Sequence, residues 1–221
     1  AVIPLFILDP ETEAIGAAAK WRLGLSIADF AAQLEGVGSR LVLRRGPALA
    51  VLEALLAETG AAGVHWSRAY DPAGIARDSA VKAALKAKGL EAVSHPGFLL
   101  HEPWSVETGQ GGFYRVYTPY WKAVKDRPIG AVLPAPKALR APQIWPASDR
   151  LEAWQMGAAM RRGALICLKY QAVGEVGAAR RLADDHGALA GSLRGRALVY
   201  FSGITLAILE PAARATLLSA I

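Results

Sequence analysis

Strand-like runs alternate with helix-like stretches through the first 95 residues of the chain. The run Val2–Leu8 is apolar throughout, as is typical of a strand buried on both faces of a parallel sheet. The regular alternation predicts an α/β domain in which right-handed crossovers place helices against the sheet. The predicted strands are Val2–Leu8, Arg40–Arg44, Gly63–Ser67 and Leu90–His95.

Start and stop signals define the helices predicted between these strands. Pro47 fits the first helical position of the second helix, where its missing N–H costs nothing. The Asp71-Pro72 pair gives the third helix an N-cap carboxylate followed by proline. Glycines end all three. The predicted helices are Ala14–Leu34, a helix from Pro47 to Gly60, and a helix from Asp71 to Lys88.

A Rossmann-like sheet of this kind binds ligands at the carboxyl ends of its strands. The segments that follow the predicted strands are Asp9–Glu13, Arg44–Pro47, Ser67–Asp71 and His95–His101. Arg68, Tyr70 and Glu102 would line this edge. One hypothesis is therefore a stand-alone module that binds a nucleotide or a chromophore at the carboxyl edge of the sheet.

Composition excludes several other classes of protein. No apolar run reaches the roughly 20 residues that a membrane span needs, and Val2–Leu8 lacks the flanks of a signal peptide. The single cysteine, Cys167, is predicted to be a buried thiol and favours a reducing, cytoplasmic setting. His65 is predicted as a core or sheet residue, and no histidine spacing indicates a metal site. The net charge of +6 fits an anionic partner as well as it fits biased codon usage.

Aromatic, basic and glycine residues mark the segment that follows the fourth strand. Its cations alternate with Tyr114, Tyr117, Tyr120 and Trp121. Such a pattern suits single-stranded nucleic acid, but we favour an aromatic belt that packs a long connection against the sheet and a second domain. The glycine-rich Gly109–Gly112 lies outside any strand-to-helix turn and so only weakly indicates a phosphate site. The cations are Arg115, Lys122, Lys125 and Arg127.

Several of these segments resemble the DNA photolyase/cryptochrome family, most closely its bacterial deoxyribodipyrimidine photolyases. The most specific is Gly112–Ala123, which contains the family pattern Y-[KR]-V-[FY]-T-P-[FY] as YRVYTPY. Trp145-Pro146 and Gly174-Glu175 are similar to the family's passage into its second domain. The other segments that carry the resemblance are Val2–Pro10, Ala62–Asp78 and Phe98–Trp104.

The resemblance implies an architecture and an activity. Residues 1–127 would form the α/β antenna domain, residues 128–150 an interdomain linker, and residues 151–221 the incomplete start of a helical FAD-binding domain. The family splits UV-induced pyrimidine dimers in DNA with light and reduced FAD, as a carbon–carbon lyase acting on a flipped-out dimer. The implied protein is a monomer that binds damaged DNA, FAD and an antenna chromophore of open type, with no metal and no membrane contact.

The sequence also departs from the family pattern. The family's first strand, in the middle of the sheet, has no counterpart, so backbone groups of both neighbouring strands should be exposed. Ser202 and Thr205 match the FAD-phosphate motif by type, whereas Phe201 replaces its leading Thr. The Asn-Glu pair of the folate-type antenna site corresponds to Ala73 and Gly74, which leaves other antenna types open.

These departures lead to an expectation about activity and to two alternatives. The chain alone should have little or no repair activity, and no catalytic residue can be assigned in it. One alternative is an inactive gene fragment. Another is that Ala197–Leu209 supplies the missing central strand. Cyclobutane-dimer repair, (6-4) repair and cryptochrome signalling are not separated by the residues present.

Overall fold

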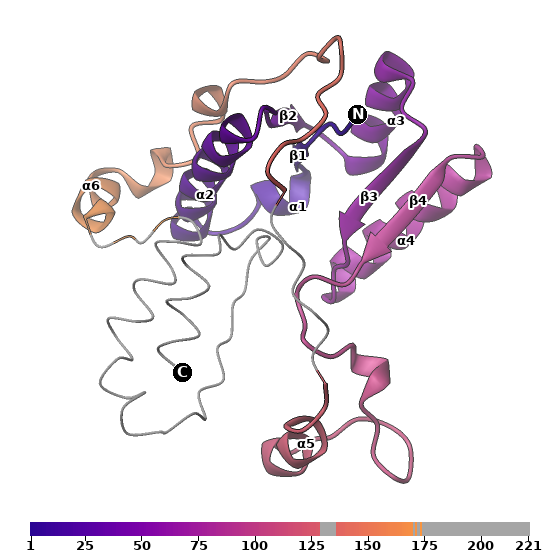
Figure 1. Ribbon diagram of the computed structural model, residues 1–221. Coiled ribbons are helices and arrows are strands. Elements are labelled where there is room, and N and C mark those ends of the chain that lie inside the picture. Colours follow the sequence, from indigo (N-terminus) through magenta and orange to yellow (C-terminus); the bar gives the residue numbers. More distant parts are fainter. Residues whose placement is uncertain (129–135, 170, 172, 174–221) are drawn as a thin grey trace.

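A computed structural model describes residues 1–128, 136–169, 171 and 173 of the chain. Strands and helices alternate up to residue 95 in the predicted order, which confirms the α/β fold class (Figure 1). The elements are β1 (Leu5–Leu8), α1 (Pro10–Glu13), α2 (Ala17–Gly36), β2 (Val42–Arg45), α3 (Ala48–Thr59), β3 (Gly63–Ser67), α4 (Pro72–Ala87) and β4 (Glu91–His95).

The four strands form two parallel pairs. β1 pairs with β2 in a register that places Leu5 opposite Val42. β3 pairs with β4 so that Gly63 lies opposite Glu91. Figure 1 shows the spatial order β2, β1, β3, β4, with β1 and β3 on the inner sides. The arrangement agrees with a parallel sheet that lacks its middle strand.

Helix ends follow the capping signals, with two corrections. The Asp71 side chain accepts a hydrogen bond from Gly74 N at 2.8 Å and caps α4 as predicted. Asp9 caps α1 in the same way through Thr12 N, and this short helix was not predicted. The predicted helix Ala14–Leu34 is present as α2, which begins three residues later. Pro47 is the N-cap of α3 rather than its first helical residue, because its ψ of 130° is extended.

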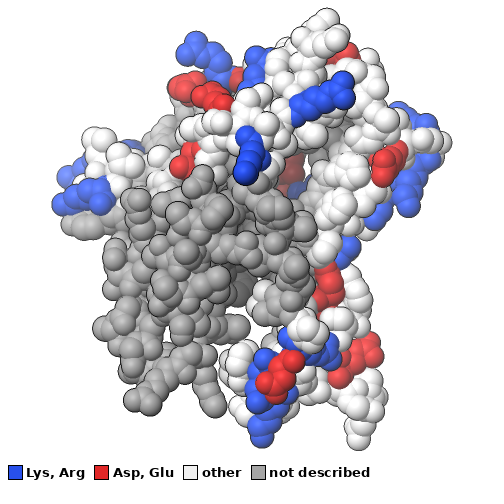
Figure 2. Space-filling view, in the orientation of Figure 1, with Lys and Arg blue, Asp and Glu red and all other residues white. Residues whose placement is uncertain are grey.

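The aromatic segment forms a lobe that contains η1 (Pro103–Ser105) and α5 (Tyr117–Val124). Figure 2 shows basic and acidic side chains close together on this lobe. Tyr117 is 61 % exposed and Tyr120 is 36 % exposed. These two rings therefore do not pack against the sheet, and the second domain that the prediction also placed against the belt lies mostly outside the described residues.

Residues 151–168 form short helical pieces instead of the predicted helix from Leu151 to Met160. Gln155 and Arg161 both have a φ of 48°, in the left-handed region, and so interrupt the helix. The remaining predicted segments, Val173–Asp185 and Ala197–Leu209, lie almost wholly or wholly outside the described residues. The pieces are η2 (Leu151–Trp154), η3 (Ala158–Met160) and α6 (Arg162–Leu168).

The described part of the predicted linker follows the surface of the α/β body. Leu139 N donates to Val37 O at 3.0 Å, and Asp149 N donates to Leu43 O at 2.8 Å. Ala147 N donates to the Glu58 carboxylate, and this hydrogen bond lowers the pKa of Glu58. The boundaries at residues 127 and 150 stay predictions, but the segment is anchored at several points along its length.

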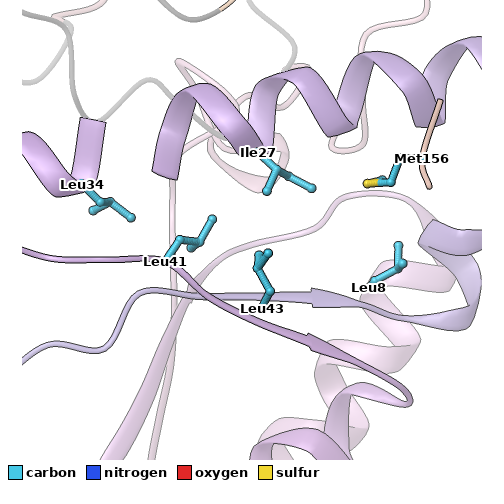
Figure 3. Close-up of a cluster of buried hydrophobic side chains, with 6 residues drawn as sticks. All are labelled: Leu8, Ile27, Leu34, Leu41, Leu43 and Met156. Atoms are coloured by element: carbon cyan, nitrogen blue, oxygen red, sulfur yellow. The ribbon is translucent and has the colours of Figure 1, made fainter. Parts of the chain in front are cut away.

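Two apolar clusters lie on opposite faces of the strands. The first packs α2 against β1 and β2 and is closed by Met156, whose Cβ lies 3.1 Å from the position of a Cβ built on Gly24 (Figure 3). The second packs α3 and α4 against β1, β3 and β4 around the fully buried Leu85. Residues on alternate positions of β1 thus enter different clusters, as the period of a strand requires.

Two further expectations concern Cys167 and membranes. The Cys167 side chain is only half-buried, so the prediction of a buried thiol is wrong. In the part of the chain that the structure describes, no helix has both the length and the apolar character to cross a bilayer.

Candidate functional site

The carboxyl ends of β3 and β4 bring together the three side chains that the sequence placed there. Arg68 follows β3 directly, and its Nη1 donates to Glu102 Oε1 at 2.6 Å. The Tyr70 hydroxyl donates to the same carboxylate, at 2.8 and 2.9 Å from its two oxygens. Arg68, Tyr70 and Glu102, called the edge cluster below, confirm the expected meeting at this edge.

Backbone and aromatic contacts orient the edge cluster further. Arg68 Nη2 donates to Ser94 O in β4 at 3.2 Å, which fixes the guanidinium across the strand pair. The guanidinium carbon lies 5.0 Å from the ring centroid of Trp104, within the range of a cation–π contact. Trp104 is 60 % exposed, so one indole surface is open to solvent beside two charged groups. The sequence analysis did not single out Trp104, although its place two residues after Glu102 was the available signal.

The edge cluster is electrically balanced and only partly buried. The Arg68 side chain is 28 % exposed and that of Glu102 is 18 % exposed. Burial raises the pKa of Tyr70, and the neighbouring Glu102 carboxylate raises it further, while Arg68 acts in the opposite direction. Tyr70 is therefore a neutral donor at physiological pH, and the carboxylate is held by two donors.

The pKa shift of Tyr70 predicts a pH dependence of stability. The folded-state pKa lies above the unfolded one, so the neutral phenol stabilises the fold fully below about pH 10. That contribution is lost as the pH rises through the folded-state pKa. We expect Tyr70→Phe to reduce the loss of stability between about pH 9 and pH 12 in urea unfolding. Tyr114→Phe, at an aromatic position of the lobe, is the control, and equal pH slopes for Tyr70→Phe and the parent would contradict the assignment.

A second polar network joins the carboxyl end of β1 to α4. Arg77 Nη1 donates to Asp9 Oδ2 at 2.9 Å, and Arg77 Nε donates to Asp78 Oδ1 at 3.0 Å. Asp78 in turn accepts from Trp66 Nε1 in β3 at 3.0 Å. Burial acts to lower the pKa of Arg77, but Asp78 and Asp9 outweigh it and the pKa is raised. Arg77, Asp9, Asp78 and Trp66, the bridging network, are satisfied by one another and bind the two strand pairs together.

Among the positions that were compared with cofactor motifs of the family, the structure describes Gly74 but not Ser202 and Thr205. Ser202 and Thr205 lie outside the described residues, so their assignment to FAD phosphate stays a prediction. Gly74 is buried in the first turn of α4, and a Cβ there would lie 2.6 Å from Ala69 Cβ and from Asp71 Oδ2. The backbone of this turn has no room for a side chain at residue 74, so the Glu of a folate-type pair does not fit here.

The remaining candidates take no part in the edge cluster. The glycine-rich segment closes on itself in a turn, with Gly111 N donating to Thr108 O and Thr108 N donating to Gly112 O, both at 2.9 Å. His65 stacks on His95 with 3.0 Å between Nδ1 and Nε2, and it is half exposed, so it is a sheet residue but not a core residue. No cluster of three potential metal ligands occurs in the described ranges.

Known proteins are similar to this chain in sequence and in fold. The family model described as DNA photolyase matches residues 1–142. A deoxyribodipyrimidine photo-lyase of Agrobacterium fabrum is 42 % identical over 198 residues, which covers 88 % of this chain. Cryptochrome-2 of Arabidopsis thaliana is 34 % identical over 67 % of the chain.

Solved structures give the same picture. A class III photolyase from Agrobacterium tumefaciens superposes with a TM-score of 0.76 at 39 % identity and covers 88 % of this chain. A cryptochrome from Synechocystis has a TM-score of 0.54 at 20 % identity over 67 % of the chain, a likeness that concerns the fold.

The matches cover most of this chain but less than half of each relative. The chain spans 41 % of the Agrobacterium photo-lyase and 26 % of the Arabidopsis cryptochrome. The matched residues 1–142 include the α/β body, the edge cluster and the aromatic lobe. On the strength of this match, the chain belongs to the DNA photolyase family.

Proposed function

We propose that this chain is the α/β part of a deoxyribodipyrimidine photolyase, which uses light and FAD to split UV-induced pyrimidine dimers in DNA. The observation that carries the proposal is the 42 % identity to the Agrobacterium photo-lyase across 88 % of the chain. Identity to the plant cryptochrome is lower, at 34 %, which favours repair over signalling. Damaged DNA as the partner, a monomeric state and a cytoplasmic location stay predictions.

FAD finds no matching cradle among the described residues. A dinucleotide held by backbone N–H groups needs a glycine-rich turn between a strand and a helix. The turn at Gly109–Gly112 uses its own N–H and carbonyl groups and stands before the lobe helix. FAD would supply the photochemical electron when bound, but no step through it can be assigned to residues described here.

The first consequence is a prediction about the isolated 221-residue chain. We expect it to bind FAD far below one equivalent and to clear no cyclobutane dimers under blue light. The reasons are its span of 41 % of the relative and the lack of a cradle among the residues that the structure describes. The measurement is flavin absorbance after dialysis with excess FAD, followed by repair of an oligonucleotide that contains one dimer.

The Agrobacterium photo-lyase, treated identically, is the positive control for both readouts. Stoichiometric FAD together with dimer repair by the 221-residue chain would overturn the prediction of inactivity. FAD binding without repair would instead place the cofactor site within this chain and leave the photochemistry to residues absent from it.

A second candidate function is a stand-alone chromophore-binding or nucleotide-binding module. It is favoured by the edge cluster, where a carboxylate and a guanidinium lie beside the exposed ring of Trp104. A planar heterocycle could stack on the indole and form hydrogen bonds with the charged groups. Pterin, deazaflavin and flavin chromophores all present such a ring.

Absorption spectroscopy tests this second candidate. We expect protein purified from its host to carry a band beyond that of its tryptophans, and Glu102→Gln to reduce bound chromophore about tenfold through loss of an ionic partner. Glu107→Gln, on the exposed surface five residues away, is the matched control. If the purified protein shows no such band, or if both variants bind equal amounts of chromophore, the edge cluster is not a chromophore site.

A further inference from the structure

Two histidines from neighbouring strands meet on one face of the β3–β4 pair. His65 is the middle residue of β3 and His95 is the last residue of β4, and Ser67 lies opposite His95 in the parallel register. Because side chains alternate along a strand, His65 and Ser67 share one face with His95. Trp66 points to the other face, where it packs with α3 and α4. The two imidazoles therefore lie on the face that these helices leave uncovered.

The ring nitrogens are as close as two ligands of one metal ion. His65 Nδ1 and His95 Nε2 are 3.0 Å apart. Imidazole nitrogens bind metal ions at about 2.0–2.1 Å, so two of them at right angles on one ion lie about 2.8–3.0 Å apart, and at the tetrahedral angle about 3.4 Å. The observed separation thus suits adjacent positions of a square-planar or tetragonal ion, the geometry that Cu²⁺ and Ni²⁺ adopt.

A carboxylate beside the second nitrogen of His65 favours the ring form that binds metal. Glu91 Oε2 is 4.0 Å from His65 Nε2. A negative charge there favours the proton on Nε2 and leaves the Nδ1 lone pair directed at His95. His95 then donates its Nε2–H to His65, and when an ion binds in place of that proton, the proton moves to Nδ1 of His95. Metal-binding histidines commonly have such a carboxylate at their other nitrogen, which orients the ring and makes it a stronger ligand.

The pair is accessible to an ion from solvent. The side chain of His65 is 52 % exposed, that of Glu91 is 62 % exposed, and His95 is exposed as well. An exposed ring can turn to aim its lone pair at the ion, and water completes the coordination. Only two protein ligands are needed, so the site is compatible with the lack of a three-ligand cluster in the part of the chain that the structure describes.

We propose that His65 and His95 form a surface site for a divalent transition ion of the Cu²⁺ or Ni²⁺ type, with Glu91 as the positioning carboxylate. An ion bound there joins β3 to β4 through side chains as well as through the backbone, so it stabilises the folded chain. The two histidines are 30 residues apart in the sequence, which is why no local spacing indicated a metal site.

Binding of Ni²⁺ and Cu²⁺ to the full 221-residue chain tests the site. Every protein compared carries Cys167→Ser, which removes the thiol as a competing ligand. We expect isothermal titration to give one Ni²⁺ per chain, and the electron paramagnetic resonance spectrum of bound Cu²⁺ to show coupling to two imidazole nitrogens. Saturating Ni²⁺ should also raise the midpoint of urea unfolding.

Matched substitutions assign the ligands. His65→Phe and His95→Phe keep a ring on the strand but remove its nitrogens, and each should weaken Ni²⁺ binding at least about tenfold because the second ligand no longer binds intramolecularly. Glu91→Gln should weaken binding about tenfold and leave the two-imidazole signal of Cu²⁺ in place, as expected of a positioning residue. The control is His101→Phe with His186→Phe, which should leave the affinity unchanged.

Three outcomes overturn the proposal. They are no saturable binding up to about 1 mM Ni²⁺, an affinity that His65→Phe leaves unchanged, and a Cu²⁺ spectrum with fewer than two imidazole nitrogens in the control variant. The control variant keeps only His65 and His95 of the four histidines in the chain. Its spectrum therefore decides the matter even if His65→Phe fails to fold.

Discussion

Replacing Leu85 by alanine should lower the free energy of unfolding by about 2–5 kcal/mol. Leu85 is 0 % exposed and lies at the centre of the cluster between α4, α3 and the strands. Its removal leaves a cavity that the surrounding elements cannot close, because the same cluster also supports β1 and β3. Urea unfolding followed by circular dichroism measures the change.

The matched control is the same substitution at an exposed leucine. Leu100 is 55 % exposed, and Leu100→Ala should change the free energy of unfolding by no more than about 0.5 kcal/mol. A loss below about 1 kcal/mol for Leu85→Ala would show that this cluster is not a packed core.

Replacing Arg77 by methionine should cost about 1–3 kcal/mol of unfolding free energy. The methionine keeps an apolar stem but leaves Asp9, whose side chain is 8 % exposed, without its cationic partner. The cost is below that of a fully buried pair because the Arg77 side chain is 33 % exposed to solvent. Urea unfolding at neutral pH measures the effect.

Arg150→Met is the control for this second prediction. Arg150 and Glu152 form an ion pair at 3.8 Å with side chains that are 85 % and 78 % exposed, and such pairs contribute little. In a double-mutant cycle, Arg77→Met and Asp9→Asn should be non-additive because the two side chains share a hydrogen bond. Strict additivity would show that the bridging network does not hold Asp9 and Arg77 together.

Local signals predicted the order and type of the elements well. The Asp71-Pro72 start of α4 carries its own capping chemistry, so these two residues suffice to predict it. The edge cluster was predictable for a related reason, since parallel strands end at a common edge and Arg68 follows one of them directly.

Features that depend on distant packing were less predictable. Residues 151–160 contain a helix-like apolar pattern, but Met156 and Trp154 are drawn into the first cluster and the chain turns at Gln155. The bridging network unites Asp9 with Arg77, 68 residues apart, and no local spacing reports such a contact. The exposure of Tyr117 was missed because aromatic composition alone does not say which surface covers a ring.

The contact between Met156 and α2 affects how relatives of this chain can be recombined. The thioether side chain fills the notch left by Gly24 on α2, and Trp21 lies against Gly157. A chimera with its crossover at residue 127 would take α2 from one parent and the segment that carries Met156 from the other, so the two contacting surfaces would not match. A crossover placed after Met160 takes Gly24 and Met156 from the same parent. The segment that must be exchanged as one piece therefore extends beyond the strands and helices of the α/β domain, to Met160.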